Sequence, residues 1–151
     1  MQGLVNPSPD DSIDTRFLES LIGYNARRAA LIIIEQFIQQ MAEHELRPVS
    51  FSVLSIIQHN PGITSSQLCA TLGILPPNLV ALLKPLQKRA WIERHPHPHD
   101  GRAMALHLTA TGKTIMTTAE RKATALELQA TSKLSPSERK NLLRLLKKVY
   151  A

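Results

Sequence analysis

The sequence is poor in cysteine and in aromatic residues, and it has no long apolar run. Its single cysteine, Cys69, excludes a framework of intrachain disulfides and is typical of a reducing compartment. The longest apolar run, Ala29 to Ile34, is far shorter than the roughly 18–20 residues that a membrane helix needs. The first residues include acidic side chains and no cationic, apolar leader. These absences predict a cytoplasmic protein without a membrane span.

Positive charge is what the chain has in excess. Among its 151 residues, 18 lysines and arginines face 12 aspartates and glutamates, which gives a formal net charge of +6 with histidine neutral. Such an excess favours polyanionic partners, either nucleic acid or an anionic membrane surface. The hydrophobic fraction of 43% is sufficient for the core of a single folded domain.

Most of the chain has the periodicity of helices. We expect a flexible arm over residues 1–12, followed by one long helix from about Asp14 to Glu45. A helix of that length is expected to pack partly on a second chain. Prolines and capping residues predict five further helix starts, at Pro48, Thr64, Pro76, Thr109 and Ser135.

A β-hairpin is predicted between the helices that begin at Pro76 and Thr109. In its second strand, Met104, Leu106 and Leu108 alternate with smaller or polar residues, which is typical of a half-buried ribbon. A helix followed by a basic hairpin is the geometry of a winged helix-turn-helix. The predicted fold is therefore mainly α with a small β-hairpin wing and six helices. Residues 47–109 form the lobe, and residues 13–46 and 110–151 form a helical dimerisation region.

These elements resemble the MarR family of transcription regulators over roughly residues 18–150. The resemblance is carried by residues 46–54, 64–74 and 86–94, and by Asp100-Gly-Arg102 with the Leu106–Gly112 segment. It implies a two-fold dimer that binds double-stranded DNA, with the fourth helix in the major groove and the wing arginine in the minor groove. It also implies a repressor that leaves a pseudo-palindromic operator when a small aromatic or anionic ligand binds. Residues 75–80 are similar to those of regulators of aromatic-acid catabolism, some of which sense aromatic CoA thioesters.

Three segments are expected to contact DNA. The start of the third helix offers hydroxyls and amide N–H groups to a phosphate. The fourth helix has few polar side chains on its outer face, so shape readout is expected to exceed direct base readout. Arg102 at the hairpin tip suits a narrow minor groove, and Asp100 is expected to orient it or to pair with Arg89 or Arg94. The predicted DNA-contacting residues are Thr64, Ser65, Ser66, Pro77, Asn78, Val80, Ala81, Lys84, Lys88, Arg94, His97, His99, Asp100 and Arg102.

Two residues of the recognition segment depart from what a helix prefers. Pro85 lies inside the fourth helix, where it removes the hydrogen bond to the Ala81 carbonyl and either bends the helix or is simply tolerated. Ala90 stands at the helix end, where glycine would turn the chain more easily.

An effector pocket is predicted from aromatic and basic residues near the first helix. Arginine beside apolar surface can hold a carboxylate, and aromatic side chains can cover a ring. The predicted pocket residues are Tyr24, Arg27, Arg28, His44 and Phe51. No cofactor is expected.

The histidines of the predicted wing allow a second interpretation. His95, His97 and His99 precede Asp100, so a metal-dependent enzyme or sensor is conceivable, but their extended Pro-rich spacing does not surround a common centre. We therefore predict no metal and assign them to phosphates. The sequence has no nucleophile elbow or Walker loop, so no enzyme is expected. An effector-independent architectural DNA-binding protein is the other alternative. Cys69 is expected to be a small core residue.

Overall fold

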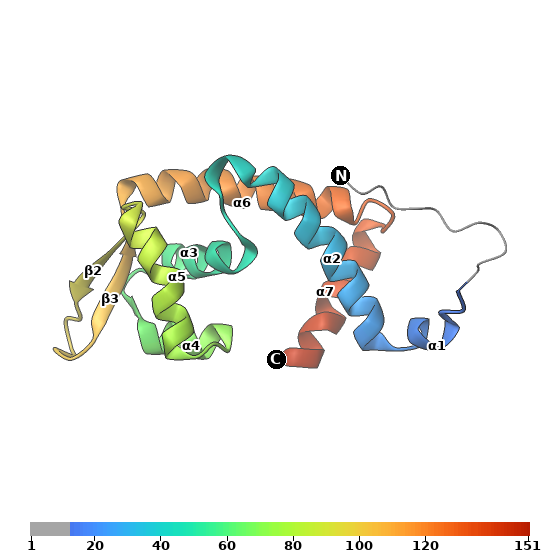
Figure 1. The fold of residues 1–151 in the computed structure, drawn as a ribbon, viewed down its shortest axis with the longest axis horizontal. Helices are drawn as coiled ribbons and strands as arrows, with labels where there is room; N and C mark the ends of the chain where they lie inside the picture. Colours follow the sequence, from blue (N-terminus) through green and yellow to red (C-terminus); the bar gives the residue numbers. More distant parts are fainter. Residues whose placement is uncertain (1–12) are drawn as a thin grey trace.

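A computed structural model describes residues 13–151, so the predicted arm over residues 1–12 lies outside the described residues. The elements follow one another as α1 Arg16–Glu19, α2 Ile22–Gln40, the 3-10 helix η1 Ala42–His44, α3 Pro48–His59, β1 Ile63–Thr64, α4 Ser65–Leu72, α5 Pro76–Lys88, β2 Ile92–Pro96, β3 Met104–Leu108, α6 Ala110–Ala130 and α7 Pro136–Tyr150. Figure 1 shows a lobe of α3, α4, α5 and the sheet at one end of the molecule. The long helix α6 connects this lobe to α7, and α2 and α1 lie toward the other end.

The single long helix predicted near the N-terminus is wrong, because the structure divides it. Leu21 is extended with ψ 128°, so α1 ends at Glu19 and α2 begins at Ile22. The Asn25 side-chain amide donates to the carbonyl oxygens of Glu19 at 2.7 Å and Leu21 at 2.8 Å. Because these bonds satisfy carbonyl groups at the break, the chain can change direction there. Within residues 13–151 there are thus seven α-helices rather than the six predicted.

The helix starts predicted from capping residues are confirmed. The Thr64 hydroxyl accepts the Gln67 N–H at 3.2 Å, and the Thr64 N–H donates to Gln67 Oε1 at 3.0 Å. The same reciprocal pair joins Ser135 and Glu138 at the start of α7. There the hydrogen bonds from the backbone and side chain of Ser135 lower the pKa of the Glu138 carboxyl. Gly73 ends α4 in the left-handed conformation, with φ 63°.

The predicted hairpin is part of a three-stranded antiparallel sheet with the order β1-β3-β2. In the register, Leu106 of β3 lies between Ile63 of β1 and Arg94 of β2. The expected alternation along β3 holds only in part, because Ala105 and Leu106 are both buried while Met104 is exposed. At its base β3 is the central strand and contacts α3, α4 and α6, whereas Met104 pairs with Pro96 toward the wing. The two-residue strand β1 was too short to predict.

The hydrophobic core lies in the lobe and along α6. Cys69 belongs to this core, as predicted. In contrast, α7 buries none of its residues and α2 buries only Phe37. The largest fully buried side chains are Met41, Val53, Leu54, Ile57, Leu68, Leu79, Leu83, Leu106 and Met116.

Helix α5 continues through Pro85 to Lys88. The Pro85 ring is exposed, and its carbonyl accepts the Arg89 N–H at 3.0 Å. Immediately after the helix, Ala90 has φ 56°, so it adopts the left-handed conformation that glycine favours. The chain thus makes at Ala90 the tight turn for which the sequence offers no glycine.

No individual helix within residues 13–151 has the length and apolarity of a membrane span. Within the same residues, α4 and α5 taken together, across a bend of 111°, meet that test by length and composition.

Candidate nucleic-acid interface

Helix α5 divides cleanly into a core face and an open face. Leu79, Leu83 and Leu86 are buried against the lobe. The residues of α5 that were predicted to contact DNA are all exposed: Pro77, Asn78, Val80, Ala81, Lys84 and Lys88. Only Asn78 and the two lysines among them carry polar side chains, so the open face is mainly small and apolar with a basic edge.

The start of α4 and the wing form one concave groove of about 500 Å³. Arg94 comes from β2, and Asp100 and Arg102 come from the wing tip. Six of the predicted DNA-contacting residues line the groove: Thr64, Ser65, Ser66, Arg94, Asp100 and Arg102. Hydroxyls, helix N-terminal amides and guanidinium groups are the donors that phosphates accept from. The structure thus brings together residues that are up to 38 positions apart in the sequence.

The wing tip is closed by short-range hydrogen bonds. The Asp100 carboxylate accepts the backbone N–H of Arg102 at 3.0 Å, and the Asp100 carbonyl accepts the Ala103 N–H at 3.1 Å. Asp100 therefore sets the backbone from which Arg102 projects, which is one of the roles predicted for it. The suggested pairing of Asp100 with Arg89 is wrong, because Arg89 binds Glu45 at 2.6 Å instead.

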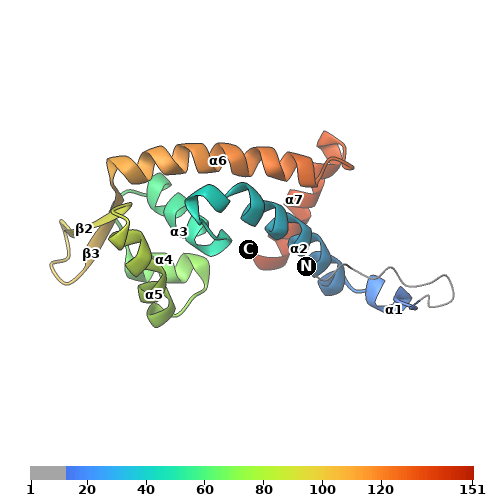
Figure 2. The ribbon, with the colours of Figure 1, turned by 45° about the horizontal axis from the view of Figure 1, so that its top comes forward.

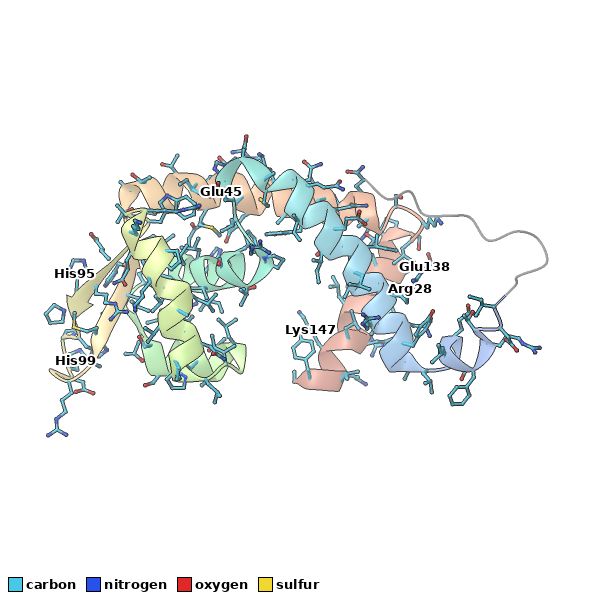
Figure 3. All side chains as sticks on the ribbon, in the orientation of Figure 1. Arg28, Glu45, His95, His99, Glu138 and Lys147 are labelled. Carbon is cyan, nitrogen blue, oxygen red and sulfur yellow. The ribbon has the colours of Figure 1, made fainter. Side chains whose placement is uncertain are left out.

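The wing histidines interact in two separate groups. His95 lies 3.1 Å from the Glu93 carboxylate and packs edge-to-face on His107, with 5.1 Å between ring centroids. His97 packs in the same way on His99 at 6.1 Å. Figure 3 shows His95 and His99 on the wing at the end of the molecule remote from α7. In the part of the chain that the structure describes, no cluster of three or more His, Cys, Asp and Glu side chains could hold a metal ion.

DNA affinity should rise modestly when the pH falls from 7.5 to 6. A protonated imidazole can form an ion pair with a phosphate, and each exposed ion pair is worth about 0.2–1 kcal/mol. The measurement is a gel-shift titration at constant ionic strength. The variant His97→Gln/His99→Gln is the control and should show a weaker response. A flat or opposite response of the unmodified protein would remove the wing histidines from the interface.

The predicted effector residues do not share one cavity. Phe51 packs edge-to-face on Phe37, with ring centroids 5.2 Å apart, and lines a pocket of about 480 Å³ between α3, α6 and α7. The other four predicted residues do not line that pocket. Tyr24, Arg27 and Arg28 lie along α2, where Tyr24 is half-buried and both arginines are exposed.

A polar cluster that the sequence did not reveal joins the lobe to α6. The Glu120 carboxylate accepts the Ser55 hydroxyl at 2.8 Å and the Gln58 amide at 3.2 Å, and it lies 2.9 Å from His59 Nε2. The three partners occupy one face of α3, but nothing in the sequence indicates which helix meets that face. This cluster fixes α6 against the lobe and thereby connects α7 to the interface.

Helices α4 and α5, the turn between them and the adjoining β-wing lie together at one end of the molecule, on the opposite side of the lobe from α6 (Figure 2). This arrangement defines the winged helix-turn-helix class.

Known proteins have this fold and are similar in sequence to this chain. A model of the MarR family matches residues 44–103. The transcriptional repressor CouR is 34% identical; its structure on a 23-mer DNA duplex covers 93% of this chain and 100% of CouR, with a TM-score of 0.87. The structure of CouR bound to p-coumaroyl-CoA covers 91% of this chain and 97% of CouR, with a TM-score of 0.81. The proposed transcriptional regulatory protein for the hcr operon of Thauera aromatica is 27% identical over 130 residues, 85% of this chain and 78% of that protein. The chain belongs to the MarR family, and it is a transcriptional regulator of that type.

Proposed function

We propose that the protein is a dimeric repressor that binds a pseudo-palindromic operator and is released from it by an aromatic acid or its CoA thioester. The observation that carries the proposal is the groove in which α4 and the wing bring hydroxyls and guanidinium groups together. Ser65 and Ser66 of this groove also line a second pocket with Val80 from the exposed face of α5. Two such surfaces related by a two-fold axis would fit half-sites about one helical turn apart.

The terminal helices support a dimer. Helix α7 is 15 residues long and amphipathic, yet it buries no residue within the single chain. A helix of this kind depends on burial of its apolar face for stability. Near the other terminus, Ile13, Phe17 and Ile22 are between 76% and 83% exposed. We assign residues 13–46 and 110–151 to the interface with a second copy, and residues 47–109 to the DNA-binding lobe.

The Phe51 pocket supports an aromatic ligand. Phe51, Ala123, Leu128 and Leu143 give it apolar walls, and Arg139 adds a cation at its edge. Arg139 is itself held by the Thr131 hydroxyl at 2.8 Å. We also propose that Arg27 and Arg28, with Tyr24 on the same helix, bind the anionic part of the ligand; His44 lies on η1, beyond the other end of α2, and is not part of this group. The similarity to CouR, which is solved with p-coumaroyl-CoA, favours a CoA thioester.

Selection of duplexes from a random-sequence pool tests the DNA-binding part of the proposal. The expected result is enrichment of a two-fold symmetric sequence, bound with an affinity that falls steeply with salt because phosphate contacts release counterions. Recovery of unrelated sequences with equal affinity would instead indicate an architectural DNA-binding protein.

The ligand part has a separate test on the selected duplex. p-Coumaroyl-CoA and free p-coumaric acid are titrated into the complex while fluorescence anisotropy reports the bound DNA. We expect release by at least one of these probes. Complete retention of DNA at saturating concentrations of both would contradict this ligand class and leave the DNA-binding result intact.

A further inference from the structure

Arg89, at the end of the recognition helix α5, is held by three different groups. Its Nη1 donates to the His44 carbonyl at 2.7 Å, and its Nη2 donates to the Glu45 carboxylate at 2.6 Å. The guanidinium plane also lies over the Trp91 ring, 4.7 Å from the ring centroid. The Arg89 side chain is 34% exposed, and the side chain of its partner Glu45 is 79% exposed. The pair lies at the surface, and the contact with Trp91 together with the two-pronged hydrogen bond orients the Arg89 side chain there.

The residues that Arg89 holds form the junction between α2 and α3. Glu45 there has φ 49°, a left-handed conformation that makes the chain turn sharply out of η1. On its other side the junction is held by α6, because Lys122 donates to the Glu43 carboxylate and thereby lowers the pKa of that group. The junction is thus held between α5 and α6.

The two elements that are proposed to contact DNA, α5 and the wing, are joined by the short segment that contains Arg89. Helix α5 ends at Lys88, and β2 of the wing starts at Ile92, so Arg89 and Trp91 lie in the three-residue connection between them. The Ala90 carbonyl in the same connection accepts the Thr109 hydroxyl at 2.6 Å. A shift of Arg89 therefore displaces the end of the recognition helix and the base of the wing together.

We propose that Arg89 is a positioning residue for DNA binding, which sets the placement of α5 and the wing by fixing them to the α2–α3 junction through His44 and Glu45. The proposal rests on the proposed DNA-binding function and adds a residue that does not itself touch DNA. Lysine cannot replace it, because a single ammonium group lacks the planar fork that stacks on Trp91 while bonding two oxygens.

The variant Glu45→Gln provides the sharpest test, because two effects act on it in opposite directions. It removes a negative charge from the protein, which by long-range electrostatics alone should tighten DNA binding. Loss of the Arg89 partner should weaken it. We expect affinity for the selected duplex to fall about three- to tenfold in Glu45→Gln and in Arg89→Lys, the range in which such indirect coupling falls. Asp11→Asn, which lies outside the residues assigned to the lobe and to the dimer interface, is the matched charge control and should bind equally well or slightly better.

A double variant and hydrogen exchange separate positioning from a general loss of stability. The double variant Arg89→Lys/Glu45→Gln should lose no more DNA affinity than the single variant that binds DNA less tightly, because both substitutions remove the same interaction. Amide exchange should rise together in residues 42–47 and 86–96 while the thermal midpoint stays within about 2 °C. Affinity of Glu45→Gln equal to or above that of the unmodified protein would overturn the inference. Failure of the unmodified protein to select any duplex would instead refute the proposed function.

Discussion

Replacing Gly112 with alanine should destabilise the protein by more than about 3 kcal/mol, a large part of the roughly 5–15 kcal/mol that stabilises an ordinary domain. Gly112 is buried in the first turn of α6, where its N–H donates to the capping Thr109 hydroxyl at 3.0 Å. A Cβ atom at this position would lie 2.1 Å from the Trp91 carbonyl oxygen and 2.9 Å from its carbonyl carbon. Both neighbours are backbone atoms, so no side-chain rotation can relieve the clash.

Urea unfolding of the variant checks this expectation. Gly101→Ala is the matched control, because nothing lies within 4 Å of the Cβ that it would add. The control should remain within about 0.5 kcal/mol of the unmodified protein, as is usual for exposed positions. Equal unfolding midpoints for Gly112→Ala and Gly101→Ala would show that α6 does not approach the Trp91 backbone so closely.

Replacing Arg102 with alanine should weaken binding to the selected duplex by about 1–3 kcal/mol, the usual cost of a lost specific arginine contact. Arg102 is exposed at the wing tip, and Asp100 fixes its backbone. An arginine on such a hairpin can enter the minor groove, where a narrow groove has the most negative potential. Fluorescence anisotropy at physiological salt measures the loss.

The variant Arg16→Ala controls for the loss of one positive charge. Arg16 is exposed on α1 and pairs with Asp14 at 2.9 Å, far from the wing in the structure (Figure 1). Its removal should change DNA affinity by much less than that of Arg102, while both variants unfold at the same temperature as the unmodified protein. If Arg102→Ala binds DNA unchanged, the wing assignment is wrong.

The features predicted correctly from the sequence are those with local signals. Thr64 with Gln67, and Ser135 with Glu138, specify helix starts through bonds only three residues apart, and Gly73 specifies a helix end by its own conformation. The exposed face of α5 followed from the leucine periodicity. Such signals are sufficient for the wing and the recognition helix, so most of the candidate interface could be located without a structure.

The remaining features depend on contacts between distant segments. The partner of Arg89 lies 44 residues earlier, and the Ser55–Glu120 bond spans 65 residues. Charge alone made Asp100 an equally plausible partner for Arg89, and only the bonds of Arg89 to His44 and Glu45 in the structure exclude it. The division of the first helix was missed for a different reason. The Asn25 bonds that accompany the break reach only four and six residues back, but the apolar periodicity continues through the break and predicts an unbroken helix. The proposed ligand pocket combines three helices, and of its lining residues only Phe51 was predicted.

Hydroxyl-radical footprinting on the selected duplex tests most directly whether two winged lobes bind one operator. We expect two protected segments related by a two-fold axis, with centres about one helical turn apart and flanking minor-groove protection that Arg102→Ala removes. A single protected segment without symmetry, or uniform protection along the duplex, would contradict the account.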